Sequence, residues 1–213
     1  MGNNQKKKNK TGLKTIAIHH GKSYADETGC VMPPIFATST FEHGNKANFD
    51  YTRSGNPNFS ILENVLKGIE NSNYCTVFNS GISAVTAIVS SLKSGDTILC
   101  ESNLYGCTIR MFEKIFRKFG IQTSYFDFTN KEYIQQISKV KPSLIWLESP
   151  TNPLLKILNL KEICSEANLR KIPVVVDNTF CTAVIQKPLE LGATLSLIST
   201  TKFINGHSDA LGG

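Results

Sequence analysis

The sequence lacks the features of a membrane protein or an exported protein. No apolar run approaches the roughly 18 residues that a helix needs to cross a bilayer. The first ten residues hold four lysines and no apolar core of the kind that a secretion signal carries. Lysine rather than Ser or Thr stands at position 6, so the pattern for N-myristoylation is not met. We therefore expect a cytoplasmic protein with no membrane partner.

Patterns for metal binding are absent as well. The six cysteines form no C-x-x-C pair and no cluster with histidine. Cysteines scattered through apolar segments are typical of reduced core residues in a cytosolic protein. We therefore predict free thiols and no metal site for the cysteines at positions 30, 75, 100, 107, 164 and 181.

Little positive charge lies on the part of the chain that is expected to fold. The formal net charge is +6, but four of these charges are the lysines of the first ten residues, which leaves +2 for the rest. A nucleic-acid groove needs basic residues clustered on the folded surface. The G-x-x-x-x-G-K-[ST] loop that binds nucleotide phosphates is also missing. Hydrophobic content of 40% and charged content of 19% are ordinary for a globular protein, and we expect no nucleic-acid partner.

The chain divides into three predicted segments. Residues 1–14 form a basic leader that we expect to be disordered. Residues 15–60 show little periodicity and contain several glycines and prolines, which indicates an extended arm with at most a short helix, lying on a neighbouring subunit. A capping box of Ser60 and Glu63 predicts that a helix begins there. Residues 61–213 form the main domain.

Strands and helices alternate through this domain. Apolar runs predict strands at 75–78, 97–100, 122–126, 143–147, 173–176 and 194–198. Helical stripes lie at 82–92, at 109–119, after a cap at Asn130 with Ile134 and Ile137 inward, and at 160–169. This alternation indicates an α/β fold with a mostly parallel sheet covered by helices on both faces. Ligands of such sheets bind at the carboxyl ends of the strands.

Polar residues follow the first two predicted strands. Ser80 and Gly81 open a helix, where backbone amides and the helix dipole favour an anion, although a plain N-cap serine would look the same. After the second strand, Tyr105 could stack on a planar ligand, exchange protons or merely pack. Cys107 beside it is either a reactive thiol or a small buried filler.

The later strands end in residues that can hold a charged ligand. Two prolines in the loop at 148–153 fix the directions of Glu148 and Asn152. Asp177 ends a triple-valine strand, where it is either a turn aspartate or the partner of a protonated heteroaromatic nitrogen. Lys202 follows the last strand among hydroxyls, where a lysine can form a Schiff base with an aldehyde cofactor or lie in an ordinary surface turn.

These features together meet the requirements of pyridoxal 5′-phosphate (PLP). They are a turn that can bind an anion, an aromatic ring that can stack, an aspartate at a strand end and a lysine after a strand. From Thr15 to Gly213 the chain also resembles the Cys/Met-metabolism (trans-sulfuration) PLP enzymes. The motifs that carry this resemblance are Y-x-R-x-x-N-P at 51–57, S-G at 80–81, Y-G at 105–106, E-S-P-x-N-P at 148–153, D-N-T-F at 177–180 and T-K-F-x-x-G-H-S-D at 201–209. The resemblance implies the large domain of an aspartate-aminotransferase-like fold.

The resemblance also implies a role for each matching residue. Lys202 would bind the cofactor and then move the substrate Cα proton, Asp177 would pair with the ring nitrogen, and Tyr105 would stack on the ring and assist proton transfer. Asn152 would face the ring hydroxyl. The cofactor phosphate would be held by Ser80, Gly81, Ile82, Ser199 and Thr201, with Tyr51 and Arg53 reaching it from a neighbouring subunit. Sites of this family are built across a dimer, and a homotetramer is implied.

The resemblance leaves the reaction open. The loop with Cys107 resembles methionine γ-lyase, which favours γ-elimination on a sulfur amino acid such as methionine, giving a 2-oxo acid, ammonia and a thiol. Residues 108–112 are nearer to the synthase pattern, so γ-replacement by a cystathionine γ-synthase or an O-acetylhomoserine sulfhydrylase, or a cystathionine lyase, is the alternative. Members of the family continue past the lysine motif into a C-terminal domain. We therefore expect the PLP-binding domain to be incomplete at its C-terminus. A catalytically inactive fragment is the alternative of a different class.

Overall fold

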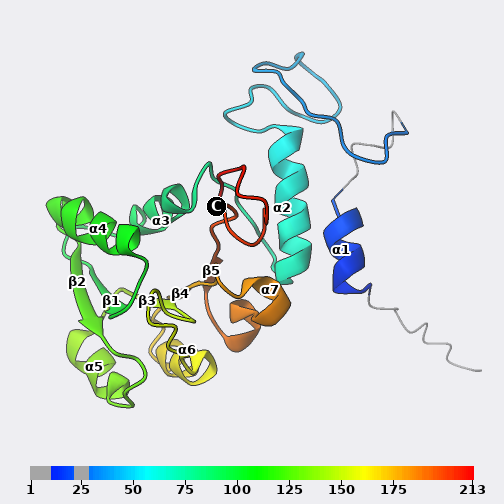
Figure 1. Cartoon of the computed structure of the whole chain (residues 1–213). Helices are drawn as coiled ribbons and strands as arrows, with labels where there is room; N and C mark the ends of the chain where they lie inside the picture. Colours follow the sequence, from blue (N-terminus) through cyan, green and yellow to red (C-terminus); the bar gives the residue numbers. More distant parts are fainter. Residues whose placement is uncertain (1–10, 22–28) are drawn as a thin grey trace, which may run out of the picture. The chain divides into compact units, whose positions relative to one another are not determined.

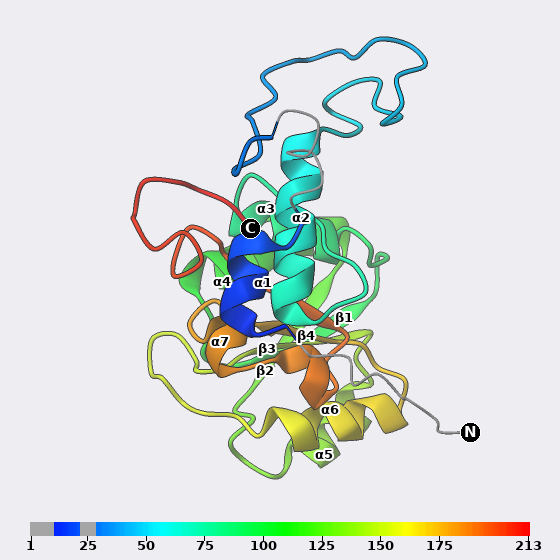
Figure 2. The ribbon, with the colours of Figure 1, turned by 90° about the vertical axis from the view of Figure 1, so that its right-hand side faces the viewer.

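The computed structural model describes residues 11–21 and 29–213, so the predicted leader lies outside the described residues as far as residue 10. The chain divides into two compact units, Met1–Thr76 and Val77–Gly213. Figures 1 and 2 show the helices and strands of each unit.

The described residues of the first unit include the helices α1 (Leu13–His19) and α2 (Pro57–Glu70). They approach closely at Gly68, where a Cβ atom would lie 2.7 Å from the His20 ring and 2.9 Å from Ile16. The described residues between the helices, 20–21 and 29–56, are mostly irregular and contain an antiparallel bridge between Thr40 and Tyr51. The arm at residues 15–60 stays a prediction, and helix α2 includes the last residues of that range from Pro57.

The start of α2 differs from the prediction of a capping box at Ser60. Helix α2 begins at Pro57, and its N-cap is Asn56, whose side chain accepts a hydrogen bond from the Asn58 amide at 2.9 Å. Asparagine is a strong N-cap, and proline suits the first helical position because its missing N–H would have no acceptor there. The Asn-Pro pair therefore overrides the Ser60–Glu63 pattern one turn later.

The second unit is built on a five-stranded sheet. Its strands are β1 (Thr97–Glu101), β2 (Gln122–Phe126), β3 (Leu144–Glu148), β4 (Val174–Asp177) and β5 (Leu195–Leu197). Their order is β2-β1-β3-β4-β5, and every neighbouring pair is parallel. Parallel strands need covered faces, which is why β3 and β4 are apolar until their last residue and buried throughout. The prediction of a parallel α/β sheet is confirmed.

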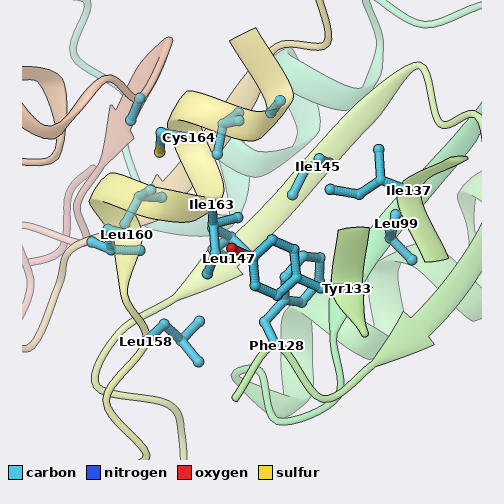
Figure 3. Close-up of a cluster of buried hydrophobic side chains, with 14 residues drawn as sticks. Leu99, Phe128, Tyr133, Ile137, Ile145, Leu147, Leu158, Leu160, Ile163 and Cys164 are labelled. Carbon is cyan, nitrogen blue, oxygen red and sulfur yellow. The ribbon is translucent and has the colours of Figure 1, made fainter. Parts of the chain in front are cut away.

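Helices cover both faces of this sheet (Figures 1 and 2). One face packs against α3 (Gly81–Val89), α4 (Gly106–Lys114) and the 3-10 helix η2 (Phe116–Phe119), around Trp146 and Phe112. The other face packs against α5 (Tyr133–Val140) and α6 (Leu160–Leu169). Figure 3 shows this second cluster, in which Ile137 and Ile163 meet Ile145 and Leu147. Two shorter helices, α7 (Thr182–Ile185) and η3 (Pro188–Leu191), lie between β4 and β5.

The predicted strand at 75–78 is not a strand in the structure. Phe78 exchanges two backbone hydrogen bonds with Gly213, at 2.7 and 3.0 Å, and the segment forms no longer ladder. A single pair of bonds does not make a strand, because a β ladder needs successive bonds along both segments. The assignment of this run as a strand was therefore wrong, although Phe78 packs against the cluster around Trp146.

Two predicted helices differ in detail. The helix at 109–119 breaks at Ile115, and the tighter turn of η2 buries Phe116 while Ile115 and Phe119 are exposed. Helix α5 has Glu132 rather than Asn130 as its N-cap residue, although the Asn130 side chain accepts from the Glu132 amide at 3.0 Å. Tyr133 and Ile137, four residues apart, are its buried residues. Ile134 was predicted inward and is 41% exposed, because it lies one position off that stripe.

Glu101 at the end of β1 is a structural residue, since its carboxylate is fully buried and accepts several hydrogen bonds. It accepts from the backbone amide of Asn103 at 3.0 Å, from that of Phe128 at 2.9 Å and from the Ser102 hydroxyl at 2.8 Å. We expect Glu101→Ala to lower the free energy of unfolding by about 3 kcal/mol, because two backbone amides lose their acceptor. Urea unfolding followed through Trp146, the single tryptophan, measures this change.

The control for this prediction is Glu132→Ala, since Glu132 is exposed and its side chain makes no capping hydrogen bond to α5. An exposed substitution of this kind changes stability by about 0.5 kcal/mol or less. Equal effects of the two substitutions would contradict the structural role of Glu101.

Candidate active site

A cavity of about 1070 Å³ opens at the carboxyl edge of the sheet in the second unit. The ends of β3, β4 and β5, the first turns of α3 and α4, and the segment after Ile198 line it. This is the edge at which the sequence predicted a ligand. Nine predicted site residues meet there, namely Ser80, Gly81, Ile82, Tyr105, Asn152, Asp177, Ser199, Thr201 and Lys202.

Tyr51 and Arg53, the remaining two predicted site residues, belong to the first unit. The Arg53 guanidinium lies 5.0 Å from the centre of the Tyr51 ring, within range of a cation–π contact. Tyr51 is 40% exposed. The two side chains therefore form one exposed pair, and their role toward a second copy of the chain stays a prediction.

The first turn of α3 is built to receive an anion. Ser80 is its N-cap, and the Ser80 hydroxyl accepts from the Ser83 amide at 3.1 Å. The amides at the start of a helix have no acceptor within it and point outward with the positive end of the dipole. Gly81 lies so close to Ser199 that a Cβ atom would be 3.0 Å from that of Ser199. Glycine thus lets the helix start and the Ser199 hydroxyl converge on one place.

Asp177 lies at the cavity wall with 7% of its surface exposed. Its Oδ1 accepts from the Thr179 amide at 3.1 Å and from the Thr179 hydroxyl at 2.6 Å. The Thr179 hydroxyl in turn accepts from the Ser199 amide at 2.9 Å, which ties β4 to the segment that carries Lys202. Burial raises the pKa of Asp177, and the Thr179 bonds lower it. Among the ion pairs of the described residues, none involves Asp177.

Glu148 is a cavity residue that the sequence reasoning did not assign to the site. It pairs with Asp177 in the register of β3 and β4, so the two carboxylates project from neighbouring strand ends. Its Oε2 accepts from the Tyr105 backbone amide at 2.7 Å. Burial, together with the charge of Asp177, raises the pKa of Glu148 to about 8. The sequence signal was present, because each of the two acids closes an apolar strand.

Tyr105 stands at the mouth of the cavity as the N-cap residue of α4, and its side chain is 41% exposed. A hydrogen bond with the Cys107 thiol, followed by the charge effect of that thiol, raises the pKa of Tyr105. Arg110 approaches the Cys107 sulfur at 3.9 Å and lowers the pKa of Tyr105. Tyr105, Cys107 and Arg110 therefore form a polar row along the first turn of α4.

Lys202 lies in the turn that follows β5, with its backbone amide donating to the Ser199 carbonyl at 3.3 Å. The side chain is exposed and lines the cavity. Asn152 comes from the loop after β3, in which the Ser149–Pro150 and Asn152–Pro153 peptide bonds are cis. Gln186 donates to the Ser149 carbonyl at 2.8 Å and holds this loop. The Lys202 amine thus reaches the cavity from the segment after β5, and the Asn152 amide reaches it from the loop after β3.

The cavity fits the cofactor that the sequence predicted. Asp177 offers a buried carboxylate with one oxygen, Oδ1, taken up by Thr179, and a protonated ring nitrogen would supply the missing positive charge. The start of α3 and the hydroxyls of Ser199 and Thr201 suit a phosphate. Lys202 provides an amine for an aldehyde. The residues present therefore match PLP in charge and in chemical class.

The described part of the structure offers neither a metal-binding cluster nor a membrane-spanning helix. Residues 11–21 and 29–213 contain no group of three or more His, Cys, Asp or Glu side chains placed to hold a metal ion. None of the helices in these residues has the length and apolar character to cross a membrane.

The chain is similar to proteins of known family. The Cys/Met metabolism PLP-dependent enzyme family matches residues 14–213. The chain is 38% identical over 205 residues to a probable cystathionine gamma-synthase of Herpetosiphon aurantiacus, covering 95% of this chain and 64% of the relative. It is 38% identical over 206 residues to a cystathionine beta-lyase of Lactococcus lactis subsp. cremoris, covering 95% and 54%.

Solved structures show the same likeness. The crystal structure of a methionine gamma lyase from Micromonospora echinospora superposes with a TM-score of 0.91 at 37% identity, over 95% of this chain and 55% of that chain. This chain thus spans between half and two thirds of the length of the relatives it matches. The site residues described above all fall within the matched region.

Proposed function

The chain belongs to the family of Cys/Met metabolism PLP-dependent enzymes, and from this we propose that the protein eliminates the γ-substituent of a sulfur amino acid such as methionine. The products would be a 2-oxo acid, ammonia and a thiol. PLP is the cofactor of this family, and when bound it withdraws electrons from the substrate Cα.

The chain's own residues would hold the cofactor at defined atoms. Lys202 Nζ would bind the aldehyde carbon, and Asp177 Oδ2 would face the ring nitrogen. The Tyr105 ring would stack on the cofactor ring, and Asn152 would face its hydroxyl. The phosphate would lie among Ser80, Gly81, Ile82, Ser199 and Thr201, which share the cavity.

Proton movements would be handled by two side chains at the cavity. Lys202 Nζ would accept the Cα proton of the bound substrate. Removal of a second proton at Cβ would expel the γ-sulfur as a thiol, with Tyr105 Oη assisting the transfer. Water would then be added and ammonia released. In total, methionine and water would give a 2-oxo acid, ammonia and a thiol.

The observation that favours elimination is the hydrogen bond between Tyr105 and the Cys107 thiol. The thiol lies beside the phenol and raises the pKa of Tyr105 further above neutral pH, so the phenol carries its proton. A neutral phenol at the cavity mouth can give a proton to a departing sulfur atom. Cys107 is also the residue through which this loop resembles methionine γ-lyase.

γ-Replacement or cystathionine cleavage is the second candidate. The segment at 108–112 resembles the synthase pattern, and similar proteins carry the names of both synthases and lyases. Tyr51 and Arg53 would complete the phosphate site of a second copy of the chain in either case, in a homo-oligomer that we propose to be a tetramer. Arginine suits this task because its guanidinium forms paired hydrogen bonds with phosphate.

The two reactions are distinguished by adding single substrates to the purified, PLP-loaded protein. We expect methionine alone to release a 2-oxo acid and a thiol in stoichiometric amounts, measured by a coupled dehydrogenase assay and by thiol titration. Cystathionine alone, and an O-acylhomoserine with and without an added thiol, serve as comparisons. Turnover that requires the O-acylhomoserine and a thiol, with none from methionine, would replace elimination by γ-replacement.

A matched variant tests the role of the thiol. Cys107→Gly removes the sulfur and leaves Tyr105 and the cavity residues in place. If the Tyr105–Cys107 bond favours elimination, this variant should lose methionine turnover while keeping its bound cofactor, as judged by visible absorbance. Unchanged turnover of methionine would remove the structural argument for elimination.

A further inference from the structure

Glu148 has a place in the site that the proposed function leaves unexplained. It is 4% exposed, lines the cavity and closes β3 after four apolar residues. A buried carboxylate is costly unless it is paired, protonated or well supplied with donors. Among the described residues no ion pair involves Glu148, and the donor recorded for it is the Tyr105 amide at 2.7 Å.

The register of the sheet brings Glu148 beside Asp177. The two residues are Cα partners in parallel neighbouring strands, and registered residues of such strands project from the same face. Alternation identifies that face, because Trp146 and Val175, two residues earlier in each strand, lie in the cluster under α3 and α4. The two carboxylates therefore lie next to each other on the cavity side of the sheet.

Glu101 shows the opposite arrangement at the same edge. It closes β1, but its alternation places it on the other face, with Leu99. There it receives two backbone amides and a hydroxyl and has no acidic partner in the register of β1 with β3. Glu148 receives one amide and has Asp177 beside it. The two strand-end glutamates therefore have different chemical environments.

Within the pair, Asp177 is the acid that ionises first. Its Oδ1 receives two donors from Thr179, and donors to a carboxylate stabilise the charged form. Two carboxylates that share a site do not both ionise easily, so the charge of Asp177 keeps the proton on Glu148. The other ionisable groups that line the cavity are Tyr105, Lys202 and Asp209. Cys100, whose pKa burial raises well above its ordinary value, lies on the neighbouring strand β1 on the same face.

We propose that Glu148 is a positioning residue that, in its protonated form, anchors the Tyr105 backbone and leaves Asp177 as the one charged carboxylate of this strand-end pair, facing the cofactor ring. This proposal rests on the proposed function only in taking PLP as the ligand. Through this hydrogen bond the carboxyl end of β3 holds the first residue of α4, and so it sets the position of the Tyr105 ring at the cavity. A neutral Glu148 can also donate a hydrogen bond within the acid pair, which an ionised one cannot.

The sign of the pH effect follows from the raised pKa of Glu148. In the unfolded chain this group releases its proton near its ordinary value of 4.5, whereas in the folded protein it keeps the proton up to about pH 8. The folded state therefore binds more protons between these limits, and the stability contributed by Glu148 is lost as the pH rises from about 5 to 8. Glutamine cannot titrate, so Glu148→Gln removes this slope.

The first experiment compares urea unfolding of cofactor-free wild type and Glu148→Gln at pH 5.5, 6.5 and 7.5, followed through Trp146. We expect the unfolding constant of wild type to rise relative to that of the variant by up to about tenfold per pH unit. Glu132→Gln, at an exposed position, is the control and should show no such trend relative to wild type. Identical pH trends for wild type and Glu148→Gln would overturn the protonated state of Glu148.

The second experiment measures PLP affinity from the quenching of Trp146 fluorescence at pH 7. Glu148→Gln keeps an acceptor for the Tyr105 amide and a donor for Asp177, so its dissociation constant should stay within about threefold of wild type. Glu148→Ala loses both, and its dissociation constant should rise about tenfold or more. Wild-type affinity in Glu148→Ala would overturn the anchoring role. Neither experiment uses a substrate, so both remain decisive even if methionine is not turned over.

Discussion

Lys202→Ala should lose all covalent attachment of PLP. Wild-type protein that is loaded with PLP and reduced with borohydride should retain the cofactor mass on one peptide, the one that contains Lys202. The variant should show no such peptide by mass spectrometry, because alanine has no amine to bind the aldehyde carbon. Turnover should fall by about 10²-fold to 10⁴-fold or more, since the same amine is the proposed base at Cα.

A matched lysine gives the control for this result. Lys161 is an exposed residue of α6, and that helix packs on the face of the sheet opposite to α3 and α4. Lys161→Ala should keep both the covalent cofactor and the turnover of wild type. The assignment of Lys202 would be wrong if its alanine variant still yielded a cofactor-modified peptide after reduction.

Asp177→Asn should change stability and cofactor binding in opposite directions. Asparagine has nearly the same shape and can keep the Thr179 bonds to its oxygen. Without a cofactor, the wild-type carboxylate has no positive partner, and its burial raises the pKa of Asp177. Removing it should raise the free energy of unfolding of the cofactor-free protein at pH 7–8 by about 1–2 kcal/mol. Loss of the charge partner should weaken PLP binding by about 30-fold or more.

The sign of the stability change can be checked through its pH dependence. The pKa of Asp177 is raised on folding, so the folded wild type binds more protons than the unfolded chain, and its stability falls as the pH rises above the ordinary pKa of 3.8. The advantage of Asp177→Asn over wild type should therefore grow from pH 4 toward pH 8. Urea unfolding of the cofactor-free proteins at these pH values measures it.

Asp127→Asn is the control for Asp177→Asn because its electrostatic environment is the reverse. The Lys156 ammonium, at 2.5 Å, and Thr129 lower the pKa of Asp127 to about 2. This aspartate stabilises the folded protein when it is ionised, so its replacement should lower stability at pH 7 and leave PLP affinity unchanged. A loss of stability in Asp177→Asn like that in Asp127→Asn would mean that Asp177 serves the fold rather than a ligand.

The sequence predicted much of the fold because the second unit obeys simple patterns. Val174 to Val176 form an all-apolar strand, and such a strand is stable only when both faces of its sheet are covered. Helix α6 spans the predicted range 160–169, and the structure adds Asn159 as its N-cap. The errors arose where two local signals compete, as at the Asn56–Pro57 start of α2, or where a tighter turn shifts the helical phase, as at Ile115.

By itself the sequence determined which residues end or follow β1, β4 and β5, and therefore that Tyr105, Asp177 and Lys202 would lie along one edge of one parallel sheet. That inference needs only periodicity and the rule that parallel strands end together. Ser80 lies at the same cavity, although the run before it is not a strand. The tertiary structure alone decided the lateral register that sets Glu148 against Asp177 and the amide of Tyr105 against Glu148. Register depends on hydrogen bonds and packing between segments far apart in the chain, and no local pattern encodes it.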